Sequence, residues 1–191
     1  MLYLNQLDYR HVPYMHNADN GYTPPEKMNV ASSGCGLCSL CMIVEHLTVK
    51  KLELEEAVRL SETNGANRKP GTSMTTLGPI VAELFGLEMT SSRDPDEMIA
   101  HLQQGGEIIV NVRANGRPQG LFTNGGHYMV IVSTDGKEVC ILDPSYTAAK
   151  FEIEGRKGKV RVDAPFIYCP IETLMEEIRD SGPAFFMFKR I

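Results

Sequence analysis

The hydrophobic pattern of this 191-residue chain changes its period at Gly106, and this change limits the folds that the chain can adopt. Before Gly106, apolar residues recur with the spacing of amphipathic helices, which predicts helices at 34–47, 52–63, 73–85 and 94–104. After Gly106, short runs rich in β-branched residues predict strands. Helices followed by antiparallel strands indicate an α+β fold of two packed layers.

The second half of the chain is expected to form an antiparallel sheet. The predicted strands cover 108–112, 128–132, 138–142, 150–154, 159–163 and 185–188, and a short helix covers 172–178. Asp135-Gly136 is a hairpin signal between two of these strands. The length suits one domain over 1–191, with a helical part at about 34–105 and a sheet part at about 106–191.

Charge and composition exclude several classes of partner. With 24 acidic and 19 basic residues the net charge is −5, whereas nucleic-acid binding needs a basic face, so we expect no nucleic-acid partner. No stretch approaches the roughly 18 apolar residues of a membrane span, and the first residues lack the regions of a secretion signal. Five cysteines, an odd number, favour reduced thiols over a disulfide framework. These features predict a cytoplasmic protein with no membrane partner.

Cys35 stands at the beginning of the first strong helical pattern, between Gly34 and Gly36. Free N–H groups and the helix dipole at a helix start favour a thiolate over a thiol. The flanking glycines allow a substrate to approach the sulfur. Cys35 is therefore a candidate nucleophile, and the alternative is a small buried hydrophobic residue, which is the usual state of a free cysteine.

Cys38 and Cys41 follow Cys35 at steps of three residues, and with Cys169 they offer a possible ligand set for a metal or an iron–sulfur cluster. On a helix, two such steps place Cys35 and Cys41 about 120° apart, so one metal ion could not bind all three cysteines without unwinding the helix. We therefore expect no metal and no cofactor, and interpret Cys38 and Cys41 as core residues. A metal or redox protein built on this triplet is the least favoured alternative.

His127 and Asp143 lie at the open end of the hairpin predicted around Asp135. His127 begins one strand, and Asp143 ends the next. A hairpin centred on Asp135 makes 127 and 143 cross-strand partners with Cβ atoms about 5 Å apart, within reach of an imidazole–carboxylate hydrogen bond. A thiol nucleophile needs such an oriented base. A hydrogen-bonded histidine at a strand end and an aspartate that begins a turn are the alternatives.

Four segments carry a family resemblance. They are Leu4-Asn5-Gln6-Leu7-Asp8-Tyr9, Ser33-Gly34-Cys35-Gly36-Leu37-Cys38-Ser39-Leu40, Gly126-His127-Tyr128-Met129-Val130 and Leu142-Asp143-Pro144-Ser145. Together they resemble the C39-like peptidase family of the papain-like superfamily. This resemblance implies a papain-like fold, in which the nucleophile lies at a helix start packed on a C-terminal antiparallel sheet, and it implies a peptide or protein substrate.

The resemblance also implies roles for four side chains. Cys35 would be the nucleophile, His127 the general base and acid, and Asp143 the group that orients His127. Gln6 would donate a side-chain N–H to the oxyanion hole, beside the backbone N–H of Cys35. Gln6 precedes Cys35 by 29 residues, so Asn29 is a second candidate donor.

Two long loops are expected around these residues. Residues 8–33 contain the breakers Asn20-Gly21 and Pro24-Pro25. Residues 113–126 lead directly to His127, so we expect this second loop to border the substrate groove and to act as a lid.

The sequence thus predicts a cysteine peptidase or related amide hydrolase with a Cys-His-Asp triad. The main alternative is a peptide-binding module with the same fold and a silent site. Family members fused to peptide exporters cleave after double-glycine leaders. These 191 residues show no transport part, so that substrate is not expected.

Overall fold

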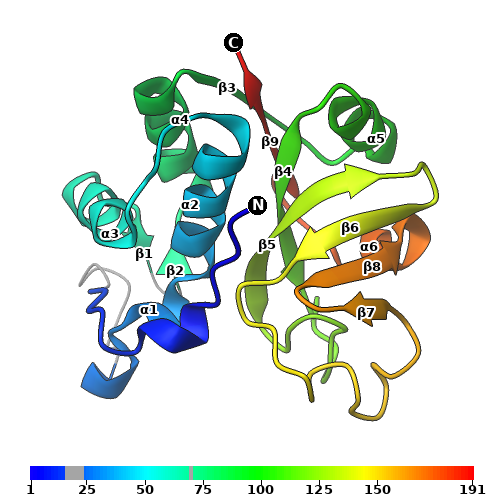
Figure 1. Cartoon of the computed structure of the whole chain (residues 1–191). Coiled ribbons are helices and arrows are strands. Elements are labelled where there is room, and N and C mark those ends of the chain that lie inside the picture. Colours follow the sequence, from blue (N-terminus) through cyan, green and yellow to red (C-terminus); the bar gives the residue numbers. More distant parts are fainter. Residues whose placement is uncertain (16–23, 69–70) are drawn as a thin grey trace.

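The structure is a computed structural model, and it describes residues 1–15, 24–68 and 71–191. Most helices lie on one side of a curved sheet, and the N-terminal segment runs between the two layers (Figure 1). The helical elements are η1 (Gln6–Tyr9), η3 (Pro25–Lys27), α1 (Val30–Ser33), α2 (Cys35–Leu47), α3 (Leu54–Thr63), α4 (Met74–Phe85), α5 (Pro95–Gln103) and α6 (Ile171–Glu177). The strands are β1 (Asn67–Arg68), β2 (Gly71–Thr72), β3 (Leu87–Ser92), β4 (Glu107–Arg113), β5 (Gly126–Thr134), β6 (Glu138–Leu142), β7 (Arg161–Asp163), β8 (Phe166–Pro170) and β9 (Phe185–Arg190).

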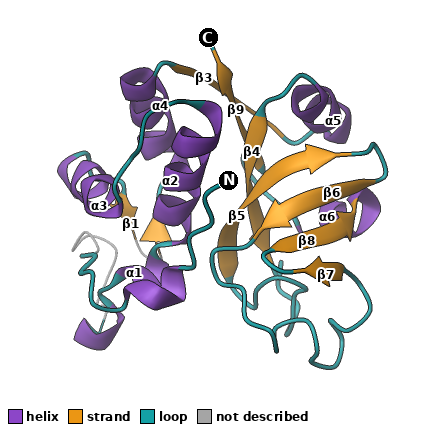
Figure 2. Cartoon of the chain, viewed as in Figure 1, coloured by secondary structure: helices purple, strands orange, loops and turns teal. Residues whose placement is uncertain are grey.

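In the described part of the chain, seven strands form one antiparallel sheet in the order β3-β9-β4-β5-β6-β8-β7. Its central strands are buried on both faces. Ile109 and Val130 pack against the core of helices α2, α3 and α4, whereas Ile108 and Met129 pack on the opposite side with residues of α5 and α6. Figure 2 shows this division of helices across the strands. Burial on both faces explains why these strands appear in the sequence as continuous apolar runs.

The predicted α+β class is confirmed, and so are the helices. The patterns at 34–47, 52–63, 73–85 and 94–104 correspond to α2, α3, α4 and α5, and the pattern at 172–178 corresponds to α6. Asp94 caps α5 by accepting a hydrogen bond from the Asp96 N–H at 2.8 Å. In the described ranges, no helix is long and apolar enough to cross a membrane.

Several strand predictions are wrong or incomplete. Residues 150–154 form turns, because Phe151 turns inward and packs edge-on against Phe122. The strand predicted at 159–163 is shorter, as β7, and it pairs with β8, which the sequence pattern did not predict. β3 was also not predicted: it pairs only with β9 at the sheet edge, and only Leu87 among its residues is fully buried, so its apolar alternation is weak.

The region predicted as a loop at 8–33 is partly helical. It contains η3, α1 and the second half of η1, and Asn29 caps α1 by accepting a hydrogen bond from the Ser32 N–H at 3.1 Å. The Asn20-Gly21 breaker lies outside the described residues.

The first six residues bind both layers. The Leu2 carbonyl oxygen accepts a hydrogen bond from His46 Nε2 on α2 at 2.7 Å. On the sheet side, the Tyr3 hydroxyl donates to the Asp143 carbonyl oxygen at 2.8 Å, and the Gln6 N–H donates to the Pro144 carbonyl oxygen at 2.7 Å. This segment therefore joins the helical layer to the loop that follows β6.

His46 also links α2 directly to the sheet, because its Nδ1 lies 2.8 Å from Glu107 Oε2 on β4. Burial lowers the pKa of His46, but the hydrogen bond and charge of Glu107 outweigh burial and raise the pKa above its usual value. Burial raises the pKa of Glu107, but both ring nitrogens of His46 face oxygen atoms, and this favours an imidazolium paired with the buried Glu107 carboxylate.

We expect His46→Leu to lower the free energy of unfolding by about 3 kcal/mol, because it leaves the Glu107 carboxylate buried without its partner. The double variant His46→Leu/Glu107→Leu should recover most of this loss, since two apolar side chains avoid the buried charge. Urea unfolding of the three proteins measures both differences. An equal loss in the single and double variants would contradict the ion-pair account.

Candidate active site

Cys35 is the first residue of α2 and faces β5 across the two layers. Gly36 permits the approach: a Cβ on Gly36 would lie 3.0 Å from Thr72 Cβ and 3.3 Å from Tyr128 Cδ2. The glycine that follows Cys35 thus has a packing role, since it brings the first turn of α2 against β5. Cys35 is partly exposed and lines a cleft of about 350 Å³ together with His127 and Tyr128.

His127 and Asp143 meet as the sequence predicts, but not for the predicted reason. In the β5–β6 hairpin, Val130 pairs with Leu142, and an irregularity between Ile131 and Ser133 shifts the ladder by one residue. Continued toward the open end, this register would bring position 145, not 143, opposite His127. The predicted direct cross-strand pairing is therefore wrong, because the turn connects Thr134 to Val139 and is centred after Asp135, not on it.

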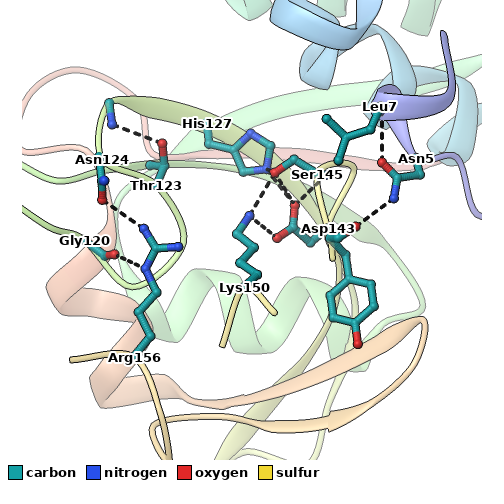
Figure 3. A network of polar contacts seen from close by, with 12 residues as sticks. Asn5, Leu7, Gly120, Thr123, Asn124, His127, Asp143, Ser145, Lys150 and Arg156 are labelled. Atoms are coloured by element: carbon teal, nitrogen blue, oxygen red, sulfur yellow. Dashed lines mark hydrogen bonds and ion pairs between the residues drawn. The ribbon is translucent and has the colours of Figure 1, made fainter. Parts of the chain in front are cut away.

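The contact instead comes from the chain that leaves β6. The carboxylate of Asp143 is fully buried, and its Oδ1 accepts a hydrogen bond from His127 Nε2 at 2.7 Å. The same Oδ1 accepts from the Ser145 N–H at 2.8 Å and from the Ser145 hydroxyl at 3.1 Å. Three donors thus fix one carboxylate oxygen and direct it at the imidazole ring (Figure 3).

Lys150 holds the other carboxylate oxygen. Its Nζ lies 2.5 Å from Asp143 Oδ2 and 2.8 Å from Ser145 Oγ, and its side chain is only 8% exposed. Figure 3 shows Lys150 and His127 on different sides of the carboxylate. The sequence pattern gave no signal for Lys150, since it lies in a segment that was predicted as a strand. Lys150 reaches Asp143 because the chain after β6 turns back on itself, and no local sequence pattern predicts that turn.

The charges of Cys35 and His127 favour an ion pair. Burial raises the pKa of Cys35, but the hydrogen bond to His127, the His127 charge and the N–H groups of Tyr128 and Gly36 together lower it below its usual value. Burial lowers the pKa of His127, but Asp143 and Cys35 raise it to about 9. Because Nε2 faces Asp143, Nδ1 is the ring nitrogen available to the thiol.

The carboxylate of Asp143 stays ionised in this environment. Burial raises its pKa, but the charges and hydrogen bonds of His127 and Lys150 outweigh burial and hold the pKa well below its usual range. Asp143 is therefore an acceptor only, and it fixes the orientation of the imidazole.

Cys38 and Cys41 lie in the core of the helical layer. Burial raises the pKa of Cys38 well above its usual value and that of Cys41 to about 12, so both are neutral thiols. Among the described residues, no group of three or more histidine, cysteine, aspartate or glutamate side chains is placed to hold a metal ion.

Gln6 is buried beside the helix that precedes Cys35. Its Nε2 donates a hydrogen bond to the Ala31 carbonyl oxygen at 2.8 Å, and its Oε1 is buried with no hydrogen-bond partner among the residues that the structure describes. One of the two Nε2 hydrogens is thus engaged within the protein. Asn29 is occupied as a helix cap, since its Oδ1 accepts from Ser32 and its Nδ2 donates to the Glu26 carbonyl oxygen at 2.8 Å.

The loop between β4 and β5 is anchored along its length. Leu121 and Phe122 are buried, the Leu121 N–H donates to Glu177 Oε2 at 2.8 Å, and Arg156 donates to the Gly120 carbonyl oxygen at 2.9 Å. Only the strand residues at its two ends, Arg113 and Gly126, line the cleft. This packing favours a fixed wall over the lid that the sequence led us to expect.

Comparisons with known proteins agree with this architecture. Residues 7–160 match the model of the Peptidase_C39 like family. The peptidase domain of Streptococcus ComA, a bifunctional ABC transporter involved in a quorum-sensing pathway, aligns with a TM-score of 0.53 at 18% identity, over 82% of this chain and 91% of that domain. A Bacillus anthracis protein described as a C39-like peptidase aligns with a TM-score of 0.52 at 15% identity, over 95% and 96%. No curated protein matches the chain.

We expect iodoacetamide to alkylate Cys35 at a pH well below the roughly 8.5 at which an ordinary thiol ionises, because the lowered pKa maintains a thiolate. In His127→Ala the burial of Cys35 is no longer opposed by the imidazolium, so alkylation should require a more alkaline pH. Peptide mass spectrometry over a pH series measures both profiles. Identical profiles in the two proteins would contradict a coupled pair.

Proposed function

We propose that this chain, which belongs to the Peptidase_C39 like family, is a cysteine peptidase that hydrolyses an amide bond in a peptide or protein substrate. The observation that carries the proposal is the continuous contact from Cys35 through His127 to the buried Asp143, with shifts in pKa that favour a thiolate and an imidazolium. A cysteine that served only to fill the core would have a raised pKa, because burial raises the pKa of a thiol.

The first half of the proposed reaction forms an acyl-enzyme. The Cys35 thiolate attacks the carbonyl carbon, and the carbonyl π electrons move to the oxygen. When the tetrahedral intermediate collapses, the C–N bond breaks, and the His127 Nδ1–H gives its proton to the departing amine. Asp143 keeps the ring oriented throughout, because its Oδ1 holds Nε2.

The second half releases the acid. The neutral imidazole of His127 takes a proton from a water molecule, and the water oxygen attacks the thioester carbonyl. Collapse of this second intermediate expels the Cys35 thiolate and restores the ion pair with His127.

Gln6 is the side chain that we propose for the oxyanion hole. Its carboxamide is held by the Ala31 carbonyl oxygen, which engages one Nε2 hydrogen and leaves the second for an oxyanion beside the backbone N–H of Cys35. Its backbone is fixed to Pro144, so the same residue is tied to the loop that carries Asp143.

Lys150 is proposed as a positioning residue. Its ammonium group binds the Asp143 oxygen that does not face His127, and this leaves Oδ1 as the imidazole acceptor. The ammonium charge also opposes the carboxylate charge and so limits how strongly Asp143 stabilises the imidazolium. Lys150 therefore sets both the orientation of Asp143 and the pKa of His127.

We expect Cys35→Ala to abolish hydrolysis of a proteome-derived peptide mixture, and Asp143→Asn to reduce kcat/KM by up to about 10⁴-fold, as for the aspartate of a serine triad. Cys41→Ala is the matched control: it changes a cysteine on the same helix that is buried in the core, and it should retain activity. Mass spectrometry of the products measures cleavage. Unchanged turnover in Cys35→Ala would overturn the proposal, and a folded wild-type protein that cleaves nothing would favour a silent binding module.

The rate should depend on pH as a bell-shaped curve. It rises as Cys35 forms its thiolate below the ordinary thiol pKa, and it falls as the His127 imidazolium loses its proton near pH 9. Lys150→Met removes a positive charge beside Asp143, so the pKa of His127 and the alkaline limb of kcat/KM should move to higher pH. Lys150→Arg keeps the charge, and its alkaline limb should stay in place. An equal change in the two variants would show that Lys150 acts through packing alone.

A further inference from the structure

The cleft beside Cys35 is basic, although the whole chain is acidic. Three arginines line it, Arg68, Arg113 and Arg179, and no aspartate or glutamate among the described residues does so. This contrasts with the net charge of −5 of the chain. A local excess of positive charge at a site in an acidic protein raises the local concentration of anionic groups.

None of these three arginines has a carboxylate partner among the described residues, in contrast to two arginines elsewhere on the molecule. Arg117 pairs with Glu177 at 2.8 Å, and Arg161 pairs with Glu138 at 3.0 Å. Arg113 and Arg179 belong to none of the ion pairs formed by the residues that the structure describes. Moreover, the Nε of Arg179 is buried without a hydrogen-bond partner among the described residues. Because an unsatisfied buried donor is costly, an acceptor that binds this guanidinium and draws the N–H out of its buried position would recover that cost.

The backbone holds Arg179 rigidly at the cleft. Its N–H donates to the Asn111 carbonyl oxygen on β4 at 2.9 Å, and its own carbonyl oxygen accepts from Arg93 Nη1 at 2.7 Å. The Asn115 side chain donates to the Ile178 carbonyl oxygen at 2.7 Å. The segment after α6 is thus fixed to the sheet, and this places the backbone of Arg179 beside the cleft before any ligand arrives.

Arg113 approaches the reacting groups from the strand that pairs with β5. Its Nε lies 3.4 Å from the point that a Cβ on Gly126 would occupy, and Gly126 immediately precedes His127. Arg179 lines the same cleft, together with Cys35 and His127. Two guanidinium groups therefore border the cleft that contains the thiol and the imidazole.

We propose that Arg113 and Arg179 bind a carboxylate of the substrate peptide next to the scissile bond. A guanidinium matches a carboxylate with paired N–H donors, and such bonds are stronger than those between neutral groups. The carboxylate is either an aspartate or glutamate side chain or the C-terminal carboxylate of a short peptide. This inference rests on the proposed peptidase function, and it names the substrate class of that same site.

The first test does not require turnover. Iodoacetate and iodoacetamide share a leaving group and differ in charge, so their rates of Cys35 alkylation report the cleft directly. We expect the ratio of the iodoacetate rate to the iodoacetamide rate to exceed that of free cysteine, and to fall by about tenfold in Arg179→Gln, since one charge-assisted hydrogen bond is lost. Arg113→Gln should also lower it, and Arg179→Lys should retain part of it.

Arg161→Gln is the control variant, because Arg161 lies on the edge strand β7, does not line the cleft and pairs with Glu138. It should leave the ratio unchanged. A wild-type ratio equal to that of free cysteine, or a ratio that neither Arg113→Gln nor Arg179→Gln lowers, would overturn the inference and leave the peptidase proposal intact.

The second test separates the two sources of carboxylate. Amidated peptides that differ only by Glu or Gln beside the cleaved bond report a side-chain carboxylate, and neutral peptides with a free or amidated C-terminus report a terminal one. A preference for the anionic member of either pair, lost in Arg179→Gln, supports the inference; no preference in both pairs overturns it. If no peptide is cleaved, the peptidase proposal fails, but the carboxylate inference can still be tested by binding. Fluorescence anisotropy then measures the affinity of Cys35→Ala for the same peptide pairs, carrying a fluorescent label. Tighter binding of the anionic member of either pair supports the inference, and equal binding in both pairs overturns it.

Discussion

The packing of α2 on the central strands is the constraint on which the rest of the structure depends. Leu37 and Leu40 of α2 and Val130 of β5 are fully buried in one apolar cluster, so the helix start cannot shift along the sheet without opening the core. This packing sets the thiol against the imidazole, and Gly36 permits the short approach. The energy that positions the site therefore comes from the apolar residues behind it.

The buried polar groups form a chain of alternating charge. Lys150, Asp143 and His127 are in contact in succession, and the pKa shifts of His127 and Cys35 favour an imidazolium and a thiolate, which would make the charges alternate along the chain of contacts. An unpaired charge would cost several kcal/mol at such a depth, so each member stabilises its neighbours. The ionisation of the thiol is thus a property of the whole chain of contacts, from a lysine after β6 to a helix start in the other layer.

The sequence predicted the parts of the fold that local patterns govern. Periodicity identified the long helices and the strands that are buried on both faces, and position at the ends of elements selected Cys35, His127 and Asp143. What it missed depends on distant contacts. The alternation around Phe151 is typical of a strand, yet the chain forms turns there and the Phe151 ring packs on Phe122. In this conformation Lys150 reaches Asp143. The Asp135-Gly136 signal placed the hairpin but not the centre of its turn, which lies after Asp135, so the right contact was predicted from the wrong register.

The N-terminal segment makes the site sensitive to limited proteolysis. Tyr3 and Gln6 hold the backbone of Asp143 and Pro144, whereas neither of them holds Cys35 or His127 through the bonds described. A single cut after Gln6 would release the loop that carries the carboxylate from these two anchors and would detach the proposed oxyanion donor, while Ser145 and Lys150 still bind the carboxylate. A neighbouring protease could therefore impair the site by cutting the chain ahead of the helical layer, without entering the cleft.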